Sequence, residues 1–210
     1  MNKRAILQQV EKTVLKCKQC RLCETAQNAV PGEGNIDAEI VFIGEAPGAT
    51  EDATGRPFVG RAGKLLEQLL SQIDRKREDV WIGNIIKHRP PKNRDPLPDE
   101  ISACQPYLTT QLNAIQPKLI VTLGRFAMNY FYKDGKITRD HGTLRRSTDG
   151  KHFIYPVYHP AAALRNGKFA ETLKEDFLKI PEMLEFIEKG EAETQTATSE
   201  VQDENQLGLF

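Results

Sequence analysis

Short apolar segments alternate along the chain with segments of helical periodicity, and this alternation is what most constrains the fold. The predicted strands are residues 39–44, 79–85, 118–123 and 153–158. Apolar residues that recur every three or four positions predict helices at residues 2–16, 62–73, 98–115 and 171–188, with a short one after Gly124. Strands that alternate with helices form a mostly parallel sheet covered on both faces. We therefore expect an α/β fold with three layers, α/β/α, around a central, mostly parallel four-stranded sheet.

The loops that follow three of these strands have unusual sequences. They begin after Ile43, after Gly83 and after Tyr158, and the first of them is rich in glycine and proline. In sheets of this kind ligands bind outside the carboxyl ends of the strands. The three loops are therefore predicted to share one site.

The composition is that of an ordinary soluble protein, with 39% hydrophobic and 28% charged residues. No stretch approaches the roughly 20 consecutive apolar residues that a membrane-spanning helix needs. The amino terminus also lacks the continuous apolar run of a secretory signal. We expect a monomer without membrane contact, located in the cytoplasm, in the cytosol or nucleoid of a bacterium.

The last part of the chain differs in composition from the rest. Residues 189–205 are rich in Glu, Thr, Ser and Gln and have almost nothing to bury, so they are predicted to form a disordered acidic linker. The five acids at residues 190–205 have no Lys or Arg among them, so the remainder of a chain of zero net charge carries +5. A moderately basic body is compatible with DNA phosphates, although an ordinary surface with a solubilising tail explains the charge equally well.

Four cysteines in a cytosolic chain point to metal binding or catalysis more than to disulfides. Cys17, Cys20 and Cys23 are each separated by two residues, a spacing that suits iron–sulfur ligation as well as zinc. The distant Cys104 could complete the ligand set. The alternative is that Cys104 is a buried apolar residue on its helix and that only the close pair binds anything.

Several motifs, in a fixed order from about residue 5 to residue 188, resemble those of the family 4 uracil-DNA glycosylases. They are residues 30–35 (Val-Pro-Gly-Glu-Gly-Asn), 44–48 (Gly-Glu-Ala-Pro-Gly), 51–52 (Glu-Asp), 55–63 (Gly-Arg-Pro-Phe-Val-Gly-Arg-Ala-Gly), Asn84, 89–96 (Arg-Pro-Pro-Lys-Asn-Arg-Asp-Pro) and 159–161 (His-Pro-Ala). The resemblance implies a glycosylase domain at residues 1–188 that hydrolyses the N-glycosidic bond of uracil in DNA, single- or double-stranded. It also implies base excision repair of deaminated cytosine.

The same resemblance implies a [4Fe–4S] cluster as cofactor. Cys17, Cys20 and Cys104 occupy three ligand positions of the family, but the position before Arg-Pro-Pro, where the family has a cysteine, is His88 here. Either His88 ligates an iron through its imidazole, as histidine does in some other clusters, or Cys23 provides the fourth ligand. His88 is the preferred candidate because relatives with all four usual cysteines often carry a cysteine at the position of Cys23 as well.

The resemblance also assigns roles at the site. The catalytic candidates are His159, Asn84 and Glu45. His159 would donate a hydrogen bond to uracil O2, and Asn84 would read the polar edge of the base. Glu45 provides a carboxylate in the first loop, although in the family its backbone matters more than its acid. The expected substrate-binding residues are Gly44, Ala46, Glu51, Phe58, Asn84, His159, Leu164 and Arg165. Among these, Phe58 would stack on the flipped base, Glu51 would exclude the methyl group of thymine, and Leu164 would fill the gap that the base leaves.

Two other interpretations stay open from the sequence. The chain could be a non-catalytic DNA-binding or redox-sensing module that uses the same cluster, or a glycosylase with a broader range of deaminated bases. Residues 206–210, Gln-Leu-Gly-Leu-Phe, resemble the pentapeptide that binds the bacterial sliding clamp. At the end of a flexible linker, Leu209 and Phe210 could enter a groove on such a partner.

Overall fold

The computed structural model describes residues 2–190, and within them the sheet has six strands in the order β1-β3-β2-β4-β6-β5. The four central strands are parallel: β2 (Ile40–Gly44), β3 (Trp81–Asn84), β4 (Leu119–Leu123) and β6 (Phe153–Val157). They confirm the predicted parallel core. The antiparallel edge strands β1 (Glu33–Gly34) and β5 (Arg145–Arg146) have two residues each, too few for a periodic pattern in the sequence.

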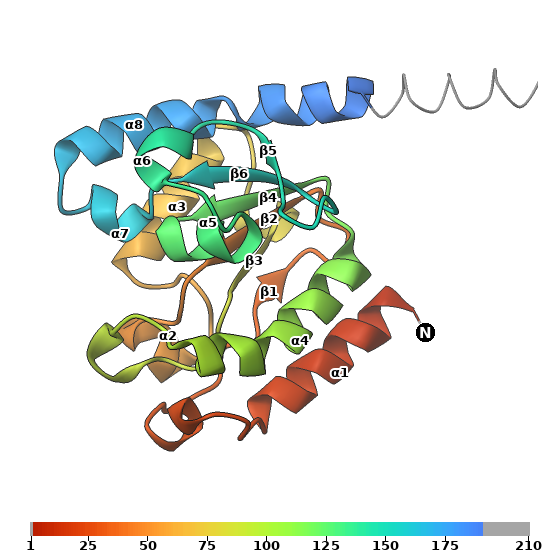
Figure 1. Cartoon of the computed structure of the whole chain (residues 1–210), viewed down its shortest axis with the longest axis vertical. Helices are drawn as coiled ribbons and strands as arrows, with labels where there is room; N and C mark the ends of the chain where they lie inside the picture. The colour runs from red at the N-terminus through yellow and green to blue at the C-terminus, as the bar shows by residue number, and fades with distance from the viewer. Residues whose placement is uncertain (1, 191–210) are drawn as a thin grey trace, which may run out of the picture.

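Helices cover both faces of the sheet, which confirms the three-layer prediction (Figure 1). One face carries α3 (Arg61–Ser71), α7 (Pro160–Ala163) and α8 (Gly167–Leu178); the other carries α4 (Pro98–Ile115) and α5 (Arg125–Phe131). Alternate side chains of a strand enter different cores: Phe42 packs with Leu66 and Phe177, whereas Ile43 packs with Leu108. Because the central strands are buried on both faces, they appear in the sequence as continuous apolar runs.

The amino-terminal helix α1 (Lys3–Leu15) lies outside the sheet, against α4 (Figure 1). The other helices are short: η1 (Arg21–Glu24), α2 (Ala49–Thr54), η2 (Arg77–Asp79), η3 (Pro91–Asn93) and α6 (Ile137–Asp140). The last predicted helix begins earlier than expected because the Asn166 side chain accepts from Lys168 N and caps α8, and residues 180–190 are helical again.

The strand register brings the predicted loops together. Gly44 pairs with Asn84, so β2 and β3 end side by side, and Leu123 pairs with Val157 at the ends of β4 and β6. In residues 2–190, no helix has both the length and the apolar character needed to cross a membrane. The predicted linker at residues 189–205, apart from its first two residues, and the predicted motif at residues 206–210 lie outside the described part of the chain.

Candidate active site

A pocket of about 600 Å³ lies at the carboxyl ends of the four parallel strands. Among its lining residues are seven of the predicted site residues: Glu45, Ala46, Glu51, Phe58, Asn84, His159 and Arg165. Gly44 and Leu164 are not part of the lining. The loops after β2, β3 and β6 thus border one shared cavity.

Asn84 is the last residue of β3 and its side chain is buried. Its Oδ1 atom has no hydrogen-bond partner among the described residues. A buried amide oxygen without a partner costs about 1–3 kcal/mol relative to a paired one. This atom is therefore a ready acceptor for the N–H group of a ligand.

Gly44, at the end of β2, lets Asn84 and Phe58 meet. A side chain at this position would collide with Asn84 Oδ1 and with the tip of the Phe58 ring. Phe58 is buried, and its ring centroid lies 5.8 Å from that of His159. An aromatic face, an amide and an imidazole therefore converge in one place, as a flat polar ring would require.

His159 caps the amino terminus of α7, and its Nδ1 accepts a 3.0 Å hydrogen bond from Ala161 N. The pKa of His159 is lowered to about 4, mainly by burial; Glu51 opposes this shift and Arg165 adds to it. The imidazole is therefore neutral at pH 7. Because Nδ1 accepts, the proton is on Nε2, which leaves Nε2–H as a donor.

Glu51 has a structural contact that the sequence did not predict. Its Oε1 accepts from Val59 N at 3.0 Å and from Gly60 N at 2.9 Å, at the amino terminus of α3. A carboxylate is favourable at a helix amino terminus because it accepts from the free N–H groups there. Glu51 therefore fixes the turn that carries Phe58.

Glu45 is a half-buried pocket residue after β2. Its pKa is raised to about 7, mainly by burial and also by the nearby Asp95, whereas Arg125 opposes the shift. Arg125 and Asp95 form a 2.9 Å ion pair. A carboxyl group with this pKa can both accept and release a proton near neutral pH.

The lining also includes residues that were not predicted as site residues from the sequence, among them Arg125, Tyr158 and Phe169. The Tyr158 and Phe169 rings are stacked, with centroids 4.7 Å apart. Arg125 follows Gly124 at the end of β4. Its position after a predicted parallel strand was the signal that could have found it, because all four strand ends meet at the same edge.

Leu164 follows α7 and is an exposed apolar residue, 48% accessible. Arg165 is also exposed and lines the pocket. Arg94, another basic residue of the pocket lining, makes two hydrogen bonds, 2.8 and 2.6 Å, to the buried Glu100. Arg94 is therefore held by the protein, whereas Arg165 can contact a ligand.

The predicted cysteine ligands lie where α1 meets α4, away from the pocket lining. Tyr107 of α4 donates a 3.3 Å hydrogen bond to Cys17 Sγ, and Lys87 N donates a 3.4 Å one to Cys104 Sγ. The pKa of Cys104 is raised to about 11, mainly by burial and also by the nearby Cys20 and Cys17, whereas Lys87 opposes the shift. Cys17, Cys20 and Cys104 are therefore close enough to influence one another electrostatically.

Within residues 2–190, no three His, Cys, Asp or Glu side chains are arranged to hold a single metal ion. A [4Fe–4S] cluster has a different requirement, because each of its four ligands binds a different iron and the sulfur atoms need not converge on one point.

Two buried polar residues, Lys87 and His88, follow β3, and the first of them contacts Cys104 through its backbone N–H. His88 Nδ1 is buried and has no hydrogen-bond partner among the described residues. The fully buried Lys87 ammonium donates to Asn84 O at 2.9 Å and to Gln111 Oε1 at 3.0 Å, both of which are neutral. Burial lowers the pKa of Lys87 to about 8. The other buried charges named here, such as Glu100, have an oppositely charged partner.

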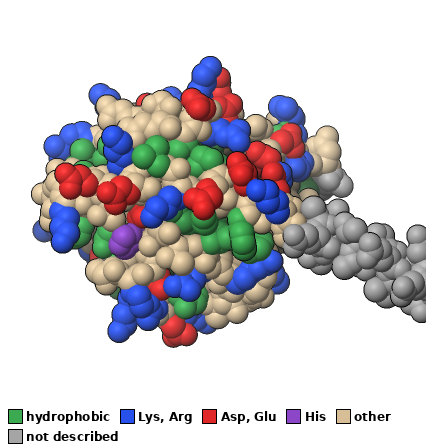
Figure 2. All heavy atoms as spheres, turned by 90° about the horizontal axis from the view of Figure 1, so that it is seen from above, with side chains coloured by type: hydrophobic (Ala, Val, Ile, Leu, Met, Phe, Trp, Pro, Cys, Tyr) green, Lys and Arg blue, Asp and Glu red, His purple; other side chains and the backbone are tan. Residues whose placement is uncertain are grey.

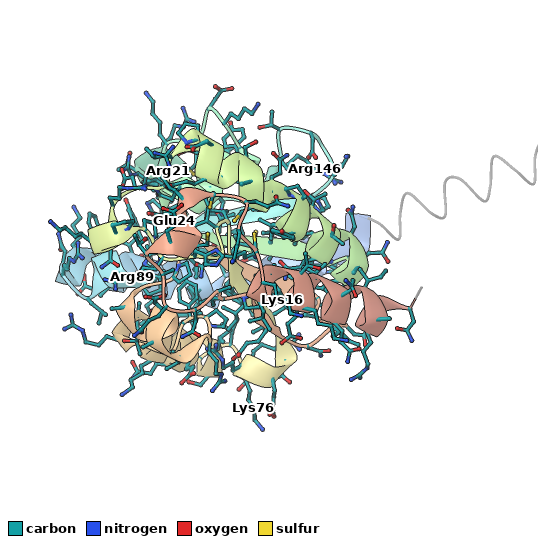
Figure 3. All side chains as sticks on the ribbon, turned by 90° about the horizontal axis from the view of Figure 1, so that it is seen from below. Lys16, Arg21, Glu24, Lys76, Arg89 and Arg146 are labelled. Atoms are coloured by element: carbon teal, nitrogen blue, oxygen red, sulfur yellow. The ribbon has the colours of Figure 1, made fainter. Side chains whose placement is uncertain are left out.

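Charged side chains are visible on two opposite faces of the protein. On the face that carries α8, Lys and Arg are intermixed with Asp and Glu (Figure 2). Seen from the opposite side, Lys16, Arg21, Glu24 and Arg89 lie on the same face; Lys16, Arg21 and Glu24 belong to the segment that carries Cys17, Cys20 and Cys23 or adjoin it (Figure 3). Lys16 and Arg21 are exposed. Basic side chains near this segment could contact a phosphate backbone.

Comparison with known proteins identifies the family. Residues 31–180 match the model of the uracil DNA glycosylase superfamily. The chain is 49% identical to the type-4 uracil-DNA glycosylase of Saccharolobus solfataricus, with 81% of this chain and 83% of the relative covered. It is 49% identical to that of Sulfurisphaera tokodaii, with 84% of each covered. For the enzyme of Thermotoga maritima the identity is 48%, over 77% of this chain and 84% of the relative. The chain is therefore a member of the type-4 uracil-DNA glycosylase family.

Proposed function

We propose that this glycosylase takes a flipped-out uracil into the pocket at the strand ends and hydrolyses its N-glycosidic bond there. Membership of the family supports uracil excision in DNA repair. The observation that carries the assignment to this pocket is the combination of a buried acceptor without a partner among the described residues, Asn84 Oδ1, and a partly buried neutral donor, His159. Uracil has the complementary edge, with an N3–H donor and carbonyl acceptors.

Selectivity for uracil follows from the Asn84 oxygen. Uracil N3 carries a proton, whereas cytosine N3 is an acceptor and would face the amide oxygen without a hydrogen bond. A site built to pair a specific N–H rejects the analogue that lacks it, because the buried group of the protein stays unpaired. Phe58 would stack on the face of the base.

His159 would stabilise the leaving group. Breaking the glycosidic bond leaves positive charge on the sugar and negative charge on the uracil ring, mainly on its oxygens. The Ala161 N–H group fixes the imidazole with its Nε2–H free to donate to uracil O2. A neutral donor oriented before the reaction begins needs no reorganisation when the charge develops.

Glu45 is our candidate for orienting and deprotonating the attacking water. Its carboxyl group lies in the pocket, and its pKa of about 7 suits a general base. Ala46, next to it, leaves space for a small molecule rather than providing a second acid. Glu51, which we expected to exclude thymine, would hold the Phe58 turn as well.

We also propose a [4Fe–4S] cluster bound by Cys17, Cys20 and Cys104, with His88 as fourth ligand and Cys23 as the alternative. The residues at this place suit such a cluster. Three thiols lie close enough to influence one another electrostatically, and the buried His88 Nδ1 has no hydrogen-bond partner among the described residues. The buried Lys87 ammonium has no paired acid among the described residues. A cluster ligated by thiolates is net negative and would balance Lys87. When bound, the cluster would cross-link α1, α4 and the segment after β3.

DNA would reach the pocket past Leu164 and Arg165. Leu164 is exposed and apolar, as a wedge that fills the vacated position in the base stack should be. Arg165 and the exposed Lys92 are candidates for phosphate contacts. For residues 206–210, outside the described residues, we keep the proposal of a sliding-clamp contact, reached through the linker at residues 189–205.

The deciding experiment uses the purified full chain and an end-labelled oligonucleotide with one uracil, followed by alkaline cleavage and, in parallel, by iron and sulfide assays. Strand cleavage at the uracil supports the proposal, and an uncleaved strand with a fully loaded protein contradicts it. Oligonucleotides with hypoxanthine or xanthine, as single and double strands, define the substrate range.

A further inference from the structure

Phe58 has an unusual backbone conformation for an aromatic residue. Its φ angle is +50°, in the left-handed region that non-glycine residues rarely adopt. Gly63, in α3, makes room for the turn, because a side chain there would collide with the Phe58 carbonyl. Such a conformation persists only where the surrounding structure enforces it. The contacts that enforce it therefore decide where the ring lies.

Arg77 provides these contacts on the carbonyl side of the turn. Its Nη1 donates to Phe58 O at 3.0 Å, and its Nη2 donates to the neighbouring Pro57 O. Glu51 holds the next two amides, as described above. The turn is thus fixed on both sides by charged side chains from different segments.

Arg77 is itself held in place. Its side chain is only 18% exposed, whereas the side chain of its neighbour Lys76 is 80% exposed and points away from the body (Figure 3). Arg77 Nε donates to Glu33 Oε1 at 3.0 Å, and Glu33 also accepts from Arg56 Nε at 3.0 Å and Nη2 at 2.8 Å. Two arginines therefore share one carboxylate beneath the Phe58 turn.

The Glu33 carboxylate is tied to the strand that carries Asn84. Glu33 lies in β1 and pairs with Ile82 of β3, and Asn84 is the last residue of that strand. The chain of contacts runs from β3 through Glu33 and Arg77 to Phe58. These contacts fix the position of the Phe58 ring relative to the Asn84 amide. A bound base would contact both groups at the same time.

We infer that Arg77 is a positioning residue for base recognition, which acts by holding the Phe58 turn through its two carbonyl contacts. This inference rests on the proposed role of Phe58 in stacking on uracil. Arg77 lies outside the residues predicted for the site and outside the pocket lining. It touches no substrate, and its effect passes through Phe58 alone.

The test uses Arg77→Ala, with Arg77→Lys as the conservative variant and Arg75→Ala as matched control. Arg75 is a nearby arginine whose ion-pair partner, Glu39, lies outside the pocket lining. Stacking acts on the base before and during the reaction, so KM should rise while kcat stays nearly constant. For Arg77→Ala we expect KM and the inhibition constant of free uracil to rise together by roughly fivefold or more, the effect of a weakened base–aromatic stack. Arg77→Lys should recover part of it, and Arg75→Ala should change neither constant.

A double-mutant cycle with Phe58→Ala separates positioning from general stability. If Arg77 acts through the ring, Arg77→Ala has little further effect on the uracil inhibition constant once the ring is gone. An equal loss in both backgrounds overturns the inference.

If Arg77→Ala does not fold, the milder variants Glu33→Gln and Arg77→Lys test the same contact. Unchanged constants in both of these variants would also overturn the inference. If Phe58→Ala itself changes neither constant, the proposed role of Phe58 fails, and the inference fails with it. If Phe58→Ala weakens uracil binding and Arg77→Ala does not, only the inference about Arg77 fails.

Discussion

The Lys87 ammonium donates a 2.9 Å hydrogen bond to the main-chain carbonyl of Asn84, whose side chain lines the pocket at the strand ends. The backbone N–H of the same lysine donates to Cys104 Sγ. One buried residue therefore contacts both the strand that we propose reads the base and a proposed cluster ligand. Its charge has no acidic partner among the described residues, so its surroundings favour an anionic group nearby.

Replacing Lys87 should therefore loosen the cluster. In Lys87→Met the iron should be lost to a chelator roughly tenfold faster or more, the usual scale for losing a supporting contact of a metal site. The loss is measured by visible absorbance and by iron per chain. Lys76→Met, which removes an exposed lysine, is the control and should lose iron at the wild-type rate. Equal rates in the two variants would show that Lys87 does not support the cluster.

The fourth cluster ligand can be identified by single substitutions. Cys17→Ser, Cys20→Ser and Cys104→Ser should each reduce iron and sulfide per chain, because each removes a thiolate. His88→Ala should do the same and should change the EPR or Mössbauer signature of the residual cluster, whereas Cys23→Ser should not. Full iron content in His88→Ala, with loss in Cys23→Ser, would reverse the assignment.

His159→Ala and Asn84→Ala should each lower kcat by about a hundredfold or more, as for the loss of a donor or partner to developing charge. His152→Ala is the control, since His152 is a partly buried histidine that does not line the active-site pocket. Single-turnover rates on a uracil oligonucleotide measure the effect. Wild-type rates for both site variants would place the chemistry elsewhere.

The pH dependence should reflect Glu45. If its ionised form is the base, kcat rises as the pH rises through about 7, the pKa of this carboxyl group. His159, with a pKa of about 4, stays neutral over this range and adds no step. Glu45→Gln should lower kcat roughly a hundredfold and abolish the rise.

Asp95 and Arg125 provide internal controls for that profile. Asp95→Asn removes a negative charge that raises the pKa of Glu45, so the rise should move to lower pH. Arg125→Leu removes a positive charge that lowers this pKa, so the rise should move to higher pH. Profiles that do not move in either variant would show that another group titrates.

Deleting residues 206–210 should weaken binding to a bacterial sliding clamp without changing excision from a short oligonucleotide. The apolar Leu209 and Phe210 would provide most of the contact. Fluorescence anisotropy of the full and the truncated chain against the purified clamp measures it. Identical isotherms would leave the pentapeptide without this function.

Much of the fold was predictable because the central strands are buried on both faces. Phe42 and Ile43 enter different cores, so the whole of β2 is apolar and is recognisable as a strand. The edge strands have only two residues and leave no such pattern. α2, α6 and α7 were not predicted, since helices of four to six residues contain too few turns for a period to show.

The site was predictable to the extent that its residues lie at strand ends or in recognisable motifs. Arg77 satisfies neither condition. It lies in a charged turn, Arg-Lys-Arg-Glu-Asp at residues 75–79, which has the composition of a solvent-exposed loop. Only the tertiary structure shows that one side chain of this turn points inward. Glu51 was assigned to the base from its motif, but its bonds to two main-chain amides depend on a loop geometry that the sequence does not encode locally.

The edge strand β1 has a second consequence, for the behaviour of the protein at high concentration. A free strand edge offers unpaired N–H and C=O groups to another molecule, and short or charged edges limit such pairing. β1 covers the outer edge of β3 with two residues, and its Glu33 is ion-paired to Arg56 and Arg77. Removing the charge of Glu33 should therefore have two effects: it weakens the contacts that hold the Phe58 turn, and it makes the edge of β3 more available for pairing with another molecule. Variants of Glu33 that lose base recognition should also self-associate more readily through β3.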